Sequence, residues 1–258
     1  MVKKILKFLK GGASVEGLDS PSASVAHSKL IRQKRFLREI YEETYGFFRE
    51  NLPAENGTIL ELGSGGGFIK QKLPNAISSD VVVLPGADVV LSGLTLPLRN
   101  ASLSGVVMMN VFHHLPDVRS FFRECSRTLT TGGKVLMVEP ANTAWGRFVY
   151  KHLHHEPFEP DQESWELEER GRMTTANDAL PWIVFCRDRD KFEKEFPDLK
   201  IDFVTPYMPI RYLLSGGVSF PQLLPSFCYP IINTLEKSFS RLHKYLGMFM
   251  KISITKVG

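Results

Sequence analysis

The stretch Thr58-Ile-Leu-Glu-Leu-Gly-Ser-Gly-Gly-Gly-Phe68 decides the fold of this chain. Apolar residues lead into the acidic Glu61, and a cluster of glycines follows at once. This pattern is typical of a buried parallel strand that ends in a tight turn beneath a polar ligand, because glycine accepts positive φ and lets the backbone approach the ligand closely. The backbone N–H groups of such a turn are free to bind polar ligand atoms.

Segments of strand and helix character alternate after this turn, which predicts parallel strands joined by right-handed crossovers. The residues between the second and third predicted strands, 81–87, are too few for the usual crossover helix. We expect strands over 58–62, 76–80, 88–92, 105–110, 134–139, 199–204 and 248–256, and helices over 30–52, 68–73 and 118–129, the last stopped by Thr130-Thr-Gly-Gly133.

The composition is that of an ordinary globular protein, with 258 residues, 43% hydrophobic and 23% charged, and a net charge of +4. We see no aromatic and basic stacking motif, so we expect no nucleic-acid partner. Cys125, Cys186 and Cys228 are odd in number and form no Cys-x-x-Cys pair, so neither a disulfide framework nor a zinc knuckle is expected. A reducing cytoplasm fits this cysteine usage.

The first ten residues, Met1 to Lys10, lack the apolar core and cleavage site of a secretory leader. On a helix they would gather four lysines on one face and Val2, Ile5, Leu6 and Leu9 on the other. This segment is either a frayed, solvated terminus or a peripheral contact with the inner, anionic face of a membrane. The sequence leaves both readings open, and it does not determine the oligomeric state.

We expect two divisions of the chain. Residues 1–28 hold the basic terminus and a flexible linker rich in Gly, Ser and Ala. Residues 29–258 form one domain, with its core at 58–140, a substrate-cap region at 141–246 and a last strand at 248–256. Three prolines interrupt the apolar stretch 220–235, which argues against a membrane span there.

The motifs together resemble the class I S-adenosylmethionine-dependent methyltransferases, in particular the branch that acts on small molecules and lipids. The resemblance is strong from Thr58 to Pro140 and weak elsewhere. It implies an α/β, Rossmann-like fold with a seven-stranded, mostly parallel sheet, helices on both faces, an N-terminal helical arm and a C-terminal cap insertion. The matching motifs are Glu61 to Gly67, Leu94-Thr-Leu-Pro-Leu98, Val106 to Leu115 with its "HHL", and Arg127 to Pro140 with its "R-x-L-x-x-G-G".

The resemblance also implies S-adenosylmethionine as cofactor and assigns residues to it. Glu61 would attract the ammonium group of the methionine part or order a bridging water, and Asp80 would bind the ribose hydroxyls. We expect the remaining cofactor contacts from Gly63, Ser64, Gly65 and Gly67 in the turn, from Ser92, Gly93 and Leu94 around the adenine, and from Asn110 and Val111 beneath the sulfonium.

Ser92 and Ser104 depart from the family pattern, which usually has aspartate at both places. They motivate an alternative function, a catalytically degenerate methyltransferase fold that serves as a binding module or complex subunit. A dinucleotide enzyme fits less well, because position 68 is Phe where the usual G-x-G-x-x-G fingerprint has its third glycine.

Histidines and acids near the strand ends supply the candidate catalytic groups, His114, His155 and Glu156. A hydroxyl acceptor needs a base, whereas the activated methyl group comes with the cofactor. The resulting prediction is methyl transfer to a small or lipid-linked acceptor, to oxygen. Structural roles for His113 and His114, and a solvated loop around residues 152–159, remain open. The spacing of these residues fits no standard metal motif, and we predict no metal.

Overall fold

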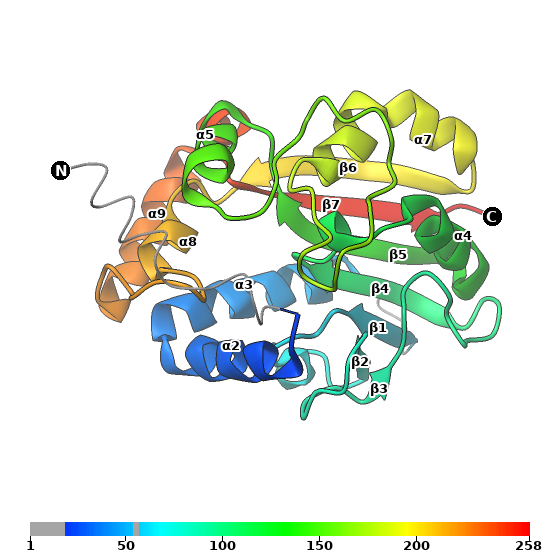
Figure 1. The fold of residues 1–258 in the computed structure, drawn as a ribbon, viewed down its shortest axis with the longest axis horizontal. Coiled ribbons are helices and arrows are strands. Elements are labelled where there is room, and N and C mark those ends of the chain that lie inside the picture. Colours follow the sequence, from blue (N-terminus) through cyan, green and yellow to red (C-terminus); the bar gives the residue numbers. More distant parts are fainter. Residues whose placement is uncertain (1–18, 54–56) are drawn as a thin grey trace.

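A seven-stranded sheet forms the centre of the computed structural model, which describes residues 19–53 and 57–258 (Figure 1). The strand order is β3-β2-β1-β4-β5-β7-β6. Strand β7 pairs antiparallel with both of its neighbours, while the other described pairs are parallel. This confirms the predicted fold class. The strands are β1 Thr58–Leu62, β2 Ala76–Asp80, β3 Val89–Val90, β4 Leu103–Met109, β5 Leu129–Pro140, β6 Leu199–Tyr207 and β7 Phe249–Lys256.

Five of the seven predicted strands have different bounds, and β3 and β5 differ most. β3 shrinks to two exposed residues because it is the edge strand and, among the described strands, pairs with β2 alone. β5 starts at Leu129, so the segment Thr130–Gly133, expected to stop the preceding helix, belongs to the strand instead. Leu103 of β4 pairs with Leu129, so the β4–β5 pairing continues on the other side of a register shift between Leu103 and Gly105.

The predicted helix over 30–52 is two helices, α2 (Pro21–Gln33) and α3 (Arg35–Asn51). Lys34 separates them with an extended backbone (φ −84°, ψ 95°), and its ammonium donates to the carbonyls of Gly217, at 2.7 Å, and of Phe220. The expected flexible linker is wrong for residues 21–28, because Pro21 opens α2 and the helix runs through the predicted boundary at residue 28. The proposed membrane contact of residues 1–10 lies outside the described residues.

The expected helix over 68–73 is reduced to η1, a single 3₁₀ turn over Ile69–Gln71. The Phe68 N–H donates to the Tyr45 hydroxyl at 3.1 Å, which fixes the chain to α3 before a helix can start. Between β2 and β3 there is no helix, as residues 81–87 predict.

Helices cover both faces of the sheet, as Figure 1 shows for α3 on one side and α4 and α7 on the other. Successive residues of β4 enter different cores: Val106 and Met108 pack with α4, whereas Val107 packs with α3. The remaining segments are η2 Phe112–His114, α4 Val118–Thr128, α5 Ala144–Leu153, α6 Leu180–Trp182, the π-helix η3 Ile183–Arg187, α7 Arg189–Glu195, α8 Arg211–Ser215, η4 Ser226–Cys228, α9 Tyr229–Ser238, η5 Ser240–Leu242 and α10 His243–Leu246.

Among the helices that the structure describes, none has the length and apolar character required to cross a bilayer.

Candidate active site

A cavity of about 1240 Å³ opens at the carboxyl edge of the sheet. Its floor consists of residues that follow β1, β2, β4 and β5, which is where open α/β sheets bind their ligands. Its walls are α2, α3 and three cap segments, 153–156, 169–175 and 212–223. Single small-molecule pockets measure about 300–1,000 Å³, so this cavity is larger than one such pocket.

The glycine turn forms one side of this cavity. Gly63 and Gly65 have φ of +62° and +50°, a conformation that strains other residues. A Cβ at Gly63 would lie 2.5 Å from a Val111 methyl carbon, so the turn and the end of β4 touch there. Gly67 does not line the cavity, although we expected it to. A Cβ there would meet the Tyr45 hydroxyl, so Gly67 packs the turn against α3.

Two acids stand at the ends of β1 and β2. Asp80 accepts a hydrogen bond from the Gly65 N–H at 3.0 Å and lies 3.7 Å from an Arg172 nitrogen. Glu61 is buried, and burial together with the nearby Asp80 charge raises its pKa to about 8. Within the described part of the chain no cationic side chain forms an ion pair with Glu61. A cavity-lining carboxyl without a cation suits the ammonium group of an amino-acid ligand.

Two further polar groups at this end lack partners among the described residues. Ser64 Oγ and Asn110 Oδ1 are buried and make no hydrogen bond, and both residues line the cavity. Asn110 adopts φ +54° directly after β4. Buried polar atoms are normally bonded, so these two oxygens fit a ligand that supplies donors. Ser92, Gly93, Leu94 and Val111 line the cavity as well, and Ser92 Oγ accepts the Leu94 N–H at 3.2 Å.

The opposite side of the cavity holds a cluster of histidines and acids around His113. Its Nδ1 lies 2.6 Å from Glu139 Oε2, and its Nε2 lies 3.2 Å from Glu156 Oε2 and 3.6 Å from Asp178 Oδ1. Burial alone would lower the pKa of His113, but the Glu139 and Glu156 carboxylates hold that pKa well above its ordinary value. His113 is therefore an imidazolium between carboxylates.

His114 behaves in the opposite way. Burial and the adjacent His113 charge lower its pKa to about 4, so the ring is neutral at physiological pH. Its Nδ1 faces the Thr175 carbonyl at 2.9 Å and carries the proton there, which leaves the Nε2 lone pair 3.8 Å from Glu156 Oε1.

The three predicted catalytic residues meet at Glu156. This carboxylate is buried, and hydrogen bonding and charge from His113 hold its pKa below the ordinary value despite burial. His155 Nε2 lies 3.5 Å from Glu156 Oε1 on the exposed side of the cluster. All three side chains line the cavity. The arrangement offers an ionised acceptor at Glu156, with a route to solvent through His155.

Two sets of these residues could hold a cation: His113 with His114 and Glu156, and His154 with Glu156 and Asp178. In each set the candidate ligand atoms lie within 4.8 Å of one another. The absence of a metal, expected from the spacing, stays a prediction.

Sequence reasoning missed Glu139 and Asp178. Both are fully buried, and Asp178 Oδ2 lies within hydrogen-bond distance, 2.9 Å, of His154 Nδ1. Glu139 had a readable signal, because it is an acid at the carboxyl end of an otherwise apolar strand. Asp178 had none, because it reaches the cluster through a loop far from any motif.

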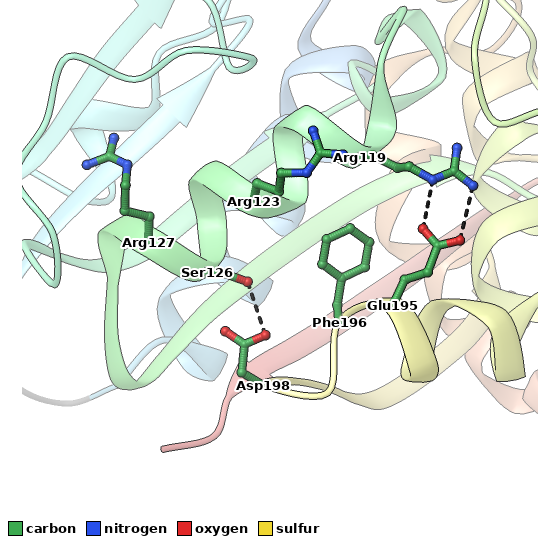
Figure 2. Close-up of a pocket in the computed structure, with 7 residues that line it drawn as sticks. All are labelled: Arg119, Arg123, Ser126, Arg127, Glu195, Phe196 and Asp198. Atoms are coloured by element: carbon green, nitrogen blue, oxygen red, sulfur yellow. Dashed lines mark hydrogen bonds and ion pairs between the residues drawn. The ribbon is translucent and has the colours of Figure 1, made fainter.

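A second, shallower hollow of about 540 Å³ lies between α4 and α7 (Figure 2). Figure 2 shows Arg119, Arg123 and Arg127 along α4. Arg119 is held by Glu195, and Arg127 donates to the Leu96 carbonyl and to Glu124. The charges there largely satisfy one another, so we place the function in the larger cavity.

Comparisons with known proteins agree with this geometry. A family profile described as a methyltransferase domain matches residues 60–137. Among curated proteins, none is similar enough in sequence to count as a match.

Two solved structures share the fold. One is described as a complex between the Haloferax volcanii Trm112 methyltransferase activator and the putative methyltransferase; it is 12% identical, with a TM-score of 0.52, over 95% of this chain and 100% of that one. The other is a geranyl diphosphate methyltransferase in complex with SAM, 12% identical, with a TM-score of 0.51, over 90% of each chain. At these identities both establish the fold alone.

The strand order and the domain match together define the class of the protein. It is an enzyme with a methyltransferase domain at residues 60–137 and the α/β, Rossmann-like fold, and S-adenosylmethionine is its cofactor.

Proposed function

We propose that the enzyme methylates an oxygen atom of a small or lipid-linked acceptor that binds beside Glu156. The observation that carries this proposal is the division of the cavity into two chemically different sides. One side has the glycine turn with Glu61 and Asp80. The other has the ionised Glu156 among histidines.

The cofactor belongs on the first side. Glu61 binds the ammonium group, Asp80 the ribose hydroxyls, and the segment Ser92 to Leu94 surrounds the adenine. Ser64 and Asn110 accept hydrogen bonds from the amino-acid part with their unpartnered oxygens. When bound, S-adenosylmethionine supplies a methyl group already activated by positive sulfur, so the protein has to align and deprotonate the acceptor.

Glu156 acts on the acceptor. Its carboxylate accepts the hydroxyl proton while the acceptor oxygen forms its bond to the methyl carbon and the sulfur–carbon bond breaks. His113, held by Glu139, fixes the orientation of Glu156. The neutral His114 presents Nε2 as a second hydrogen-bond acceptor. The exposed His155 then passes the proton to solvent.

The test has a binding arm and a turnover arm. Isothermal titration should show binding of S-adenosylhomocysteine, abolished by Gly65→Arg and weakened by Asp80→Ala. The enzyme should be incubated with methyl-labelled cofactor and with lipid and aqueous extracts separately. It should transfer the label to a compound in one of the extracts, as a base-stable methyl ether or a base-labile methyl ester. Glu156→Gln should lower labelling about 10²–10⁴-fold, as loss of a general base does, with binding unchanged.

Two outcomes would contradict the proposal. Label on nitrogen or carbon would exclude oxygen as the acceptor atom. Cofactor binding without labelling of any fraction would favour the alternative of a catalytically degenerate binding module.

A further inference from the structure

We propose that one end of the molecule binds an anionic phospholipid bilayer through an exposed apolar face. This apolar face is formed by α9, α10 and the segments next to them. Its side chains are 40% to 75% exposed: Leu223, Phe227, Ile231, Leu235, Phe239, Leu242, Tyr245 and Leu246. Contiguous exposed apolar surface of this kind marks a protein or membrane contact in a globular protein.

The spacing of these residues aligns them. Phe227, Ile231 and Leu235 follow one another at intervals of four, so they form a single stripe along η4 and α9. Phe239 continues the interval where α9 ends. The stripe lies on the outside of the molecule because the opposite side of α9 is fixed to α8 by a buried ion pair between Glu236 and Arg211.

The exposed charges that this segment itself carries have one sign. Between residues 221 and 247 the exposed charged side chains are Lys237, Arg241 and Lys244. The one acid in this segment, Glu236, is 5% exposed, since it accepts the backbone N–H groups of Ile210 and Arg211 and binds the Arg211 side chain. Basic side chains that flank apolar ones suit the headgroup layer of an anionic membrane.

Helix α5 extends the same surface. It contacts α10, and Thr143 at its start donates to the Gly247 carbonyl at 2.7 Å. Its exposed residues include Phe148, Arg147 and Lys151, and it contains no acid. Figure 1 shows α5, α8 and α9 gathered at one end of the molecule. A surface free of exposed acids over two adjacent helices favours a bilayer over a protein partner, whose contact would be expected to mix charges.

The apolar face begins at the entrance of the active-site cavity. Leu223 is 62% exposed and also lines the cavity, next to Phe220. An amphipathic acceptor held in the bilayer would enter without crossing water. This last step rests on the proposed function, whereas bilayer binding itself does not.

Vesicle flotation of the full chain tests the proposal. The wild type should float with phosphatidylcholine vesicles that contain phosphatidylglycerol, and much less with phosphatidylcholine alone. The double variant Leu235→Asp/Phe239→Asp should reduce the bound fraction at least about tenfold, because charge replaces apolar burial. Lys237→Glu/Lys244→Glu should remove the dependence on phosphatidylglycerol. The matched control is Val83→Asp, since Val83 is 78% exposed beside the opposite sheet edge at β3.

Binding of S-adenosylhomocysteine, measured on every variant, shows that the fold is intact and keeps this test separate from that of the proposed function. The proposal is overturned if the wild type remains unbound at the bottom of the gradient. It is also overturned if the double variant floats as well as the wild type, because another segment would then be responsible for binding. The wild type could also fail to float but self-associate, with the self-association abolished by Leu235→Asp/Phe239→Asp. That result would show that the apolar face binds a second copy of the chain instead of a bilayer.

Discussion

His113 and Glu139 are joined by a short, buried contact, with 2.6 Å between Nδ1 and Oε2. The other oxygen of Glu139 accepts the backbone N–H groups of Val111 and Phe112 at 2.8 and 2.9 Å. One carboxylate at the end of β5 therefore fixes both the turn after β4 and the imidazolium that faces Glu156. This relationship makes Glu139 a positioning residue for the acceptor side of the cavity.

Replacement of Glu139 by glutamine should lower the pKa of His113, because the charge that raises that pKa disappears. A histidine whose pKa is raised on folding stabilises the protein below its unfolded pKa, and this contribution is lost as pH rises through the folded pKa. In Glu139→Gln this contribution should therefore be smaller, and it should be fully lost at a lower pH. Histidine NMR and chemical denaturation across pH check this. An unchanged His113 titration would contradict the assignment.

Glu61 should make both stability and cofactor binding depend on pH. Its pKa of about 8 lies above the ordinary 4.5, so the ligand-free protein should lose stability as pH rises between these values, by at most about 1.4 kcal/mol per pH unit. Affinity for S-adenosylhomocysteine should instead increase toward pH 8, as Glu61 ionises against the ammonium. Glu61→Gln should flatten both profiles and weaken binding. Chemical denaturation measures the pH dependence of stability, and titration calorimetry measures that of binding. Both expectations would be disproved if neither stability nor affinity of the wild type changed with pH.

Gly63→Ala should destabilise the protein by about 2–4 kcal/mol, because it combines a positive φ with a clash against Val111. Val111→Ala in the same chain should recover part of this loss by removing the clash. Gly86→Ala is the control, since a Cβ there has open space and φ is not positive, and it should be neutral or slightly stabilising. Equal effects of the two glycine substitutions in urea denaturation would refute the account.

Arg211→Met should cost about 3–5 kcal/mol, because the buried Glu236 and the half-buried Glu43 would lose the cation that they share. The surface pair of Arg189 with Glu193 provides the comparison, and Arg189→Met should cost less than about 1 kcal/mol. Hydrogen exchange should show faster exchange in α8 and α9 for Arg211→Met alone. No difference between the variants would show that Arg211 does not anchor these helices.

The central sheet could be predicted from the sequence because its signals are local. Thr58–Leu62 and Ala76–Asp80 end as predicted, since each is a short apolar or small-residue run stopped by glycine, proline or acid. The cavity residues at the strand ends follow from the same motifs. Gly67 lies outside the cavity lining, and nothing in the sequence shows that Tyr45 would occupy the space beside it.

The cap could not be predicted, because contacts between distant residues shape it. Lys34 breaks the first helix by reaching carbonyls at Gly217 and Phe220, and no local pattern encodes that contact. The cluster around Glu156 likewise assembles His113, Glu139 and Asp178 from three separate segments. The residue types were visible in the sequence, whereas their convergence depends on the tertiary fold.

The missing crossover helix between β2 and β3 leaves the cavity with a second rim. Val81 lines the cavity and is 51% exposed, as Leu223 is at 62%, so the cavity wall reaches solvent beside the end of β2 as well as at Leu223. We therefore expect cofactor and acceptor to enter at different rims. We expect random-order kinetics, with S-adenosylhomocysteine competing against the cofactor at every acceptor concentration, so that spent cofactor can leave while the acceptor stays bound.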